Sequence, residues 1–267
     1  MSNSNINSEN KRGDSGDFLK TLERGLVVIK SFQDCASLTI SEAAVRSGLS
    51  RPVTRRVLLT LENLGYAHLN EGRFSLTSKI LSLGYAYLSS HNIWEIAQPF
   101  LEQLSKNVKE SSSLVILDHT DVVYAARVSV NKIMNYSLDV GSRLPAHATS
   151  PGLVLLAHLP DDKLDSYFEQ AELEALTEKT ITSETQIREE LKKIRENGWA
   201  LSSDQLELGL ISISAPVRDI RGEVVAAVNC PTHSGRVAIE QVIQEYLPFV
   251  LDAAEQISHN IEFEIIH

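Results

Sequence analysis

The chain has 267 residues, of which 43% are hydrophobic and 22% charged, with 13 glycines and two cysteines. This composition excludes collagen-like, disulfide-dense and wholly disordered chains, and the length allows one large domain or two smaller ones. The formal net charge of −10, taken as one number, argues against a protein that binds nucleic acid.

The charge, however, is unevenly distributed along the chain. Residues 1–90 carry eleven Lys or Arg against eight Asp or Glu, a net charge of +3, whereas residues 91–267 carry 14 against 27, a net charge of −13. An asymmetry of this kind predicts two modules with different partners.

Residues 1–17 are polar and rich in Ser and Asn, which is typical of a disordered segment and unlike the apolar core of a signal peptide. Cys35 and Cys230 lie far apart and fit neither a metal-binding spacing nor a secreted disulfide framework. The eight histidines are scattered, with no i, i+4 pair. We therefore expect a cytoplasmic protein with no membrane partner, no metal and no cofactor.

Three helices are predicted in the first module. An apolar repeat of three to four residues begins at Phe18 and extends to about residue 32. In the second helix Thr39 is placed to cap, Glu42 completes a capping box, and Gly48 ends the helix. The third starts at Ser50 or Arg51 with Pro52 in its first turn, and four residues are expected on its inner face: Val57, Leu58, Leu61 and Leu64.

The second and third helices are joined by residues 47–50, which predicts a helix-turn-helix. Residues 66–69 and 73–76 flank a turn at 70–72 and predict a β-hairpin. Helices followed by a hairpin indicate a winged helix-turn-helix domain over residues 18–78.

The third helix has a basic start with no acidic residue before Glu62. Arginine can bind guanine bidentately in the major groove or pair with phosphates, so this helix is expected to bind double-stranded promoter DNA. The alternative is a surface helix with solvated arginines, Arg56 being partly structural. The candidate DNA-binding residues are Ser50, Arg51, Thr54, Arg55, Arg56 and, on the wing, Arg73.

Residues 21–26, 38–44 and 58–66 resemble the DNA-binding domain of IclR-type bacterial transcriptional regulators. The resemblance continues through residues 74–77 and 81–84. It implies a dimeric regulator, because a palindromic pair of half-sites requires two copies.

A linker helix is predicted at 79–92, and residues 93–267 form the second module. Its predicted strands and helices alternate, which indicates an α+β fold with helices packed on a sheet. Strands are predicted at 114–117, 122–128, 133–140, 210–217 and 223–229, and helices at 93–109, 151–158, 161–169, 184–197 and 239–261. Residues 141–152, 198–217 and 225–229 resemble the GAF/profilin-like α/β effector-binding domain of the IclR family, so the resemblance covers the chain from Phe18 onward.

The stretch 141–152 suggests an anion site from its chemistry alone. A loop with Gly and Pro leads into an apolar helix, whose start should leave free backbone N–H groups and a positive dipole end. The hydroxyls of Thr149 and Ser150 add donors, and Arg143 adds a charge if it turns inward. The alternative for Arg143 is a solvated loop residue, and for His147 a hydrogen bond that holds the loop.

The resemblance also places effector-binding side chains on the two late strands and in the turn before them. By position these are Ser202, Ser212 and Asn229, where we expect Asp, Cys and Ser in glyoxylate-binding members. This departure favours a larger organic acid. The alternative for Ser212 and Asn229 is hydrogen bonding within the sheet. Met134 is one of the residues expected to line an apolar slot for an aromatic ring.

In finer detail, residues 55–61, 228–229 and 232–233 most resemble the Pca/Pob-type regulators of aromatic acid catabolism in the β-ketoadipate pathway. This implies an activator that senses an aromatic carboxylate such as protocatechuate or 4-hydroxybenzoate. A repressor responding to a non-aromatic acid remains an alternative, as does a second module that only oligomerises. The sequence leaves open whether the protein is a homodimer or a dimer of dimers, and whether it contacts RNA polymerase.

An enzyme is not expected. The sequence has no nucleophile elbow, phosphate-binding loop, zinc-protease motif or dinucleotide-binding glycine pattern. Ser129 and Lys132 have the S-x-x-K spacing, but its companion motifs are absent.

Overall fold

The computed structural model describes residues 18–80, 83, 93–130 and 138–264. The chain separates into two compact units, 1–90 and 91–267. Most of the expected linker helix at 79–92, and residues 131–137 of the strand expected at 133–140, lie outside the described residues. Residues 138–140 form no strand.

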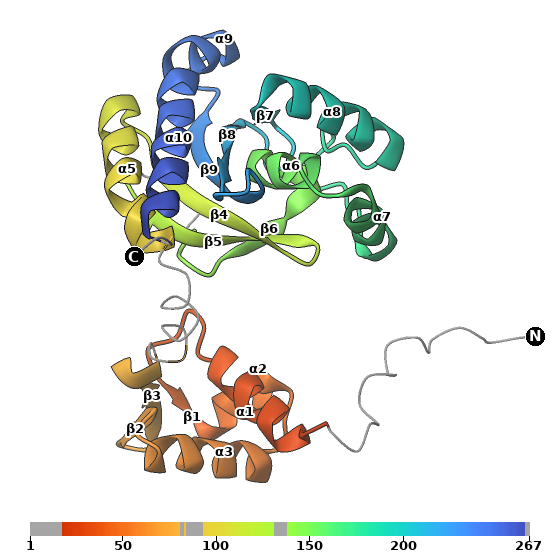
Figure 1. The fold of residues 1–267 in the computed structure, drawn as a ribbon. Coiled ribbons are helices and arrows are strands. Elements are labelled where there is room, and N and C mark those ends of the chain that lie inside the picture. The colour runs from red at the N-terminus through yellow and green to blue at the C-terminus, as the bar shows by residue number, and fades with distance from the viewer. Residues whose placement is uncertain (1–17, 81–82, 84–92, 131–137, 265–267) are drawn as a thin grey trace, which may run out of the picture. The chain divides into compact units, whose positions relative to one another are not determined.

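The first unit is a winged helix-turn-helix, as predicted. Its helices are α1 (Lys20–Lys30), α2 (Ile40–Ser47) and α3 (Arg51–Asn63), and its hairpin is β2 (Ala67–Asn70) with β3 (Arg73–Leu76) (Figure 1). A two-residue strand β1 (Leu38–Thr39), which the sequence pattern did not reveal, pairs with β3 to give the order β1-β3-β2. A short turn of 3₁₀-helix, η1 (Ser78–Ile80), follows.

Local signals set the helix ends in this unit. The Thr39 backbone N–H donates to Glu42 Oε2 at 2.7 Å, and the Glu42 N–H donates to Thr39 Oγ1 at 3.3 Å, which confirms the capping box. These Thr39 contacts lower the pKa of the Glu42 carboxyl. Gly48 follows α2 with a φ of 67°, a conformation that favours glycine.

The core of the first unit lies between the three helices and the wing. Val28, Leu58 and Phe74 are at most 1% exposed and come from α1, α3 and β3. Leu64 was expected on the same face, but it is 54% exposed because α3 ends at Asn63.

The second unit is built on a six-stranded antiparallel sheet of order β6-β5-β4-β9-β8-β7. Its strands are β4 (Ser112–Asp118), β5 (Asp121–Val128), β6 (Arg143–Pro145), β7 (Ala200–Ser203), β8 (Leu210–Arg218) and β9 (Val224–His233). Its helices are α5 (Ile93–Val108), η2 (Ala146–Ala148), α6 (Ser150–Ala157), α7 (Asp161–Gln170), α8 (Glu184–Asn197), α9 (Ile239–Gln241) and α10 (Leu247–Glu264).

Helices cover both faces of this sheet (Figure 1). α5 and α10 pack together on one face, and α6 with α8 covers the other. The edge strands β6 and β7 were not predicted, since they lie in short segments without a clear alternation. The final helix, expected to be continuous, contains a π-helical turn at Val242–Tyr246 between α9 and α10.

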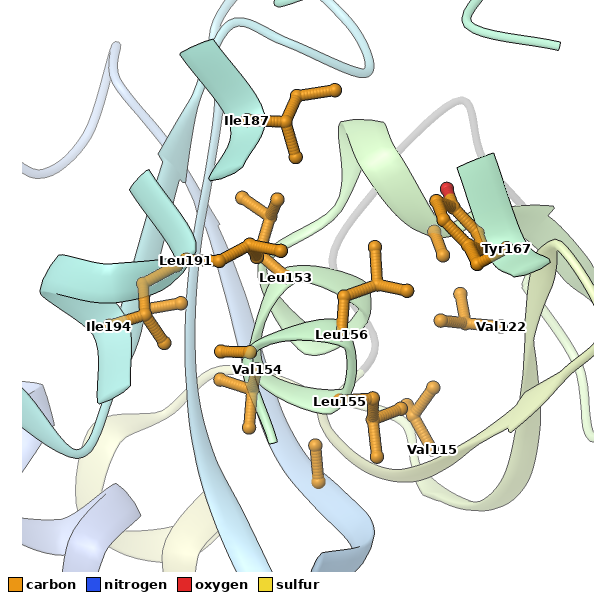
Figure 2. Close-up of a cluster of buried hydrophobic side chains, with 14 of the residues drawn as sticks. Val115, Val122, Leu153, Val154, Leu155, Leu156, Tyr167, Ile187, Leu191 and Ile194 are labelled. Carbon is orange, nitrogen blue, oxygen red and sulfur yellow. The ribbon is translucent and has the colours of Figure 1, made fainter. Parts of the chain in front are cut away.

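α6 is the centre of the helical layer shown in Figure 2. All eight of its residues are buried, as a helix that is apolar on every side requires. Leu153, Val154, Leu155 and Leu156 pack among side chains from four surrounding elements. These are Val115 of β4, Val122 of β5, Tyr167 of α7, and Ile187, Leu191 and Ile194 of α8.

In the described part of the chain, no helix combines the length and apolar character that crossing a membrane requires.

The start of α6 generates the first prediction, on stability. A Cβ on Gly152 would lie 2.1 Å from the Ala146 carbonyl oxygen, a backbone atom that cannot rotate away. Gly152→Ala should therefore lower the free energy of unfolding by about 1–3 kcal/mol, the usual cost of overpacking, as measured by urea denaturation with circular dichroism. Gly25→Ala is the control, because Gly25 lies inside α1 and no atom lies within 4 Å of the position that its Cβ would take.

For Gly25→Ala we expect unchanged or slightly higher stability, since alanine favours helix. A Gly152→Ala protein as stable as the Gly25→Ala protein would contradict the close packing of α6 against Ala146.

Candidate functional site

The start of α3 presents three arginines to solvent. Arg51, Arg55 and Arg56 are all exposed, and Ser50 at the N-cap is exposed as well. Among the described residues, none forms a hydrogen bond or an ion pair with these three guanidinium groups. Their donors are therefore available to phosphates or base edges.

Thr54 is in the same helical turn but is buried against the core, and its expected role is corrected. The side chain is fully buried, and its hydroxyl donates to the Ser50 carbonyl at 3.2 Å. A buried residue cannot contact DNA directly. Thr54 supports α3 on its core side instead.

Arg73 on β3 is engaged within its own unit. Its Nε donates to Ser37 Oγ at 3.0 Å, and its Nη2 donates to the Ser37 carbonyl and lies 3.1 Å from Glu42 Oε2. The arginine thereby ties the wing to the start of α2. Its side chain is 45% exposed, and contact with DNA stays a prediction.

The second candidate site is a cluster of buried hydroxyl and amide groups where α6 begins. The Ser150 hydroxyl lies 2.8 Å from the Oγ atoms of both Ser212 and Ser214. Asn229 Oδ1 accepts hydrogen bonds from Ser212 and from Ser214, the latter at 3.1 Å. All four side chains are at most 8% exposed, so these contacts satisfy polar groups that burial would otherwise leave unpaired.

Strand register explains how distant residues meet here. Ser214 is opposite Asn229 in the β8–β9 pair, and Ser202 is opposite Ser212 in the β7–β8 pair. Residues opposite each other in antiparallel strands share a face. The cluster therefore brings together the predicted residues Ser150, Ser212 and Asn229, with Ser202 beside them.

Two details of the expected site differ from the structure. Ser202 lies on strand β7 and not in a turn. The start of α6 offers few spare donors, since the Gly152 N–H is bound by Thr149 Oγ1 at 3.2 Å and Pro151 has no N–H. The idea that several free backbone N–H groups await an anion there is corrected, because Thr149 caps the helix.

His147 and Arg143 are each held by residues of their own unit. The Nε2 atom of His147, which is 1% exposed, lies 3.0 Å from the Glu174 carbonyl oxygen. Arg143 Nη1 pairs with Asp118 at 2.6 Å and its Nε with Asp121 at 3.0 Å.

The Asp118 hydrogen bond is the main factor that raises the pKa of Arg143. All three nitrogens of the guanidinium have partners, because Nη2 donates to the Asp118 carbonyl.

Direct contact with the effector stays a prediction for seven residues of the candidate site: Arg143, His147, Thr149, Ser150, Ser202, Ser212 and Asn229. Met134 lies outside the described residues.

Sequence reasoning missed three polar residues on this face of the sheet. They are Ser214, Ser113 of β4, which is opposite Asn229, and Arg127 of β5, which is opposite Ser113. The available signal was alternation, because Ser212 and Ser214 are two residues apart on one strand and must share a face.

Two family models match the chain. The one described as "IclR helix-turn-helix domain" matches residues 21–71, and the one described as "Bacterial transcriptional regulator IclR C-terminal" matches residues 85–259. Together they span both units.

Curated relatives match over most of their length. The chain is 38% identical over 247 residues to the Pca regulon regulatory protein of Pseudomonas putida, covering 92% of this chain and 85% of that protein. It is 36% identical over 247 residues to the p-hydroxybenzoate hydroxylase transcriptional activator of Acinetobacter baylyi, covering 90% of this chain and 91% of that protein.

Solved structures of transcriptional regulators are similar to this chain as well. A transcriptional regulator from Rhodococcus sp. RHA1 has a TM-score of 0.83 and 42% identity, covering 94% of this chain and 100% of that one. A double mutant of the PobR inducer-binding domain from Acinetobacter, in complex with 3-hydroxybenzoic acid, has a TM-score of 0.59 and 36% identity, covering 62% and 97%. The chain belongs to the IclR family of bacterial transcriptional regulators.

Proposed function

We propose that this chain activates genes of aromatic-acid catabolism when its second unit binds a small aromatic carboxylate. The observation that carries the proposal is the 36% identity to an inducer-binding domain solved with 3-hydroxybenzoic acid, 97% of which this chain covers. The similarity to a p-hydroxybenzoate hydroxylase transcriptional activator supports the same effector class and the sign of regulation.

In this proposal the first unit binds double-stranded promoter DNA. Ser50, Arg51, Arg55 and Arg56 contact the duplex from α3, and Arg73 contacts its backbone from the wing. The three α3 arginines are exposed and pair with none of the described residues, which supports this role. A helix at this place in a helix-turn-helix enters the major groove with its N-terminal residues against base edges.

The second unit binds the effector beside the Ser150–Asn229 cluster. Buried hydroxyls and an amide give hydrogen-bonding specificity in an otherwise apolar layer, the arrangement typical of small-molecule sites. The protein acts in the bacterial cytoplasm as a homodimer or dimer of dimers, contacts RNA polymerase as an activator, and has no enzymatic activity.

The DNA role predicts a charge-specific loss of affinity. Arg55→Ala removes one guanidinium from the exposed face of α3 and should weaken binding about 5- to 150-fold at fixed salt, the effect of about 1–3 kcal/mol for a base or phosphate contact. The measurement is fluorescence anisotropy with a duplex that the wild-type chain selects from a random pool. Arg221→Ala, at an exposed position between β8 and β9, is the charge-matched control.

Arg221→Ala should leave DNA affinity within twofold to threefold. Equal losses from the two substitutions, or an Arg55→Ala protein that no longer binds effector, would count against this division of roles.

The effector role predicts ligand-specific thermal stabilisation. A ligand at about 100 times its dissociation constant should add about 2.7 kcal/mol to the free energy of unfolding, seen as a rise in melting temperature. The compounds are 4-hydroxybenzoate, 3-hydroxybenzoate and protocatechuate, with pyruvate and glyoxylate as the non-aromatic controls. Stabilisation by the controls alone would overturn the aromatic assignment.

A further inference from the structure

A row of polar residues crosses the sheet on the face that α6 covers. From β5 to β8 it consists of Arg127, Ser113, Asn229 and Ser214, each opposite the next in register. Ser113, Asn229 and Ser214 are at most 1% exposed. We call these four residues the sheet-face row.

Arg127 is the only cation of the sheet-face row, and it is partly buried. Its Nη1 donates to Ser113 Oγ and its Nε to Ser129 Oγ, both at 3.2 Å. No carboxylate of the described residues lies within ion-pair distance of this guanidinium. Arg143, Arg188 and Arg236 of the same unit all have carboxylate partners.

A partly buried cation with only hydroxyl partners is costly. Burial lowers the pKa of Arg127, against opposing electrostatic effects from Tyr124 and Asp139. An anion bound at the guanidinium would remove this cost, since a charge-assisted pair is stronger than a bond to a neutral hydroxyl.

Asn229 adds a second unpaired donor in the row. Its Oδ1 accepts from the serines of β8, and within the described part of the chain its Nδ2 donates no hydrogen bond. The two branches of the planar amide point apart, so Nδ2 is directed away from those serines. Nδ2 therefore keeps two donors for a ligand.

Two other groups that were expected to bind an anion in this unit are already engaged. Arg143 is bound to Asp118 and Asp121, and the Gly152 N–H at the start of α6 is bound to Thr149. A carboxylate in this site therefore needs a cation other than Arg143.

We propose that Arg127 binds the carboxylate of the effector, with Asn229 donating to a polar group of the same molecule. This inference rests on the proposed function and deepens it by naming the charged partner. Arg127 and Asn229 are two strand spacings apart, roughly 9–10 Å between Cα atoms. A hydroxybenzoate carries both polar groups, and in this arrangement its carboxylate lies toward β5 and its hydroxyl toward β9.

The test compares acids with their amides, which have the same shape but no charge. Wild-type protein, Arg127→Gln and Arg127→Lys are titrated by isothermal calorimetry with 4-hydroxybenzoate, 3-hydroxybenzoate and protocatechuate, and with the three corresponding benzamides. Glutamine can keep the hydrogen bond to Ser113 without the charge, and lysine restores the charge. Arg188→Gln is the control, since it removes a guanidinium from α8 on the same unit.

We expect Arg127→Gln to lower the affinity for the acids at least tenfold and to leave the affinity for the amides within threefold. Arg127→Lys should recover part of the preference for acid, and Arg188→Gln should match wild type. Circular dichroism and the melting temperature establish that each variant is folded.

Two results would overturn the inference while leaving the proposed function intact: an Arg127→Gln protein with wild-type affinity for the acids, or one that loses acid and amide equally. If Arg127→Gln does not fold, a wild-type protein that binds the benzamides as tightly as the acids has the same meaning, because a cationic partner requires a preference for the acids. A wild-type protein that binds none of the acids would overturn the proposed function and this inference together.

Discussion

Burial of α6 on every side is the constraint on which the second unit depends. A helix without a solvent-exposed face must satisfy its terminal polar groups inside the protein. Thr149 caps the first turn, and the Ser150 hydroxyl bonds to the serines of β8. The sheet beneath this helix start is therefore polar, although the layer around it is apolar. The same few side chains therefore satisfy the buried start of α6 and supply the polar groups of the candidate binding site.

Features that depend on neighbouring residues could be predicted from the sequence. The Thr39–Glu42 capping box and the helix ending at Gly48 are local, so their residue types were sufficient. Strands β6 and β7 were missed because they are three and four residues long and form only through pairing with distant strands. Thr54 was misplaced because the side of α3 that faces the core is set by what packs beneath its first turn.

The candidate effector site shows the same limit. The hydroxyls and amide at 150, 212 and 229 could be named from chemistry and resemblance, but not their mutual contacts. Arg127 escaped notice because its place follows from the register of three strands.

Salt should affect binding by the two units in opposite directions. It screens the attraction between a basic surface and DNA, and it also screens the repulsion between an anion and a unit of net charge −13.

The contact between Gly152 and Ala146 has a consequence for anyone who redesigns this sensor. Position 152 admits no side chain, because any Cβ would collide with backbone. The loop and α6 therefore form a fixed wall, and substitutions at position 152 destabilise the protein. Ser202, by contrast, already carries a side chain and lies at the edge of the cluster on the outermost strand β7. Libraries that alter ligand preference are best built from that edge inward.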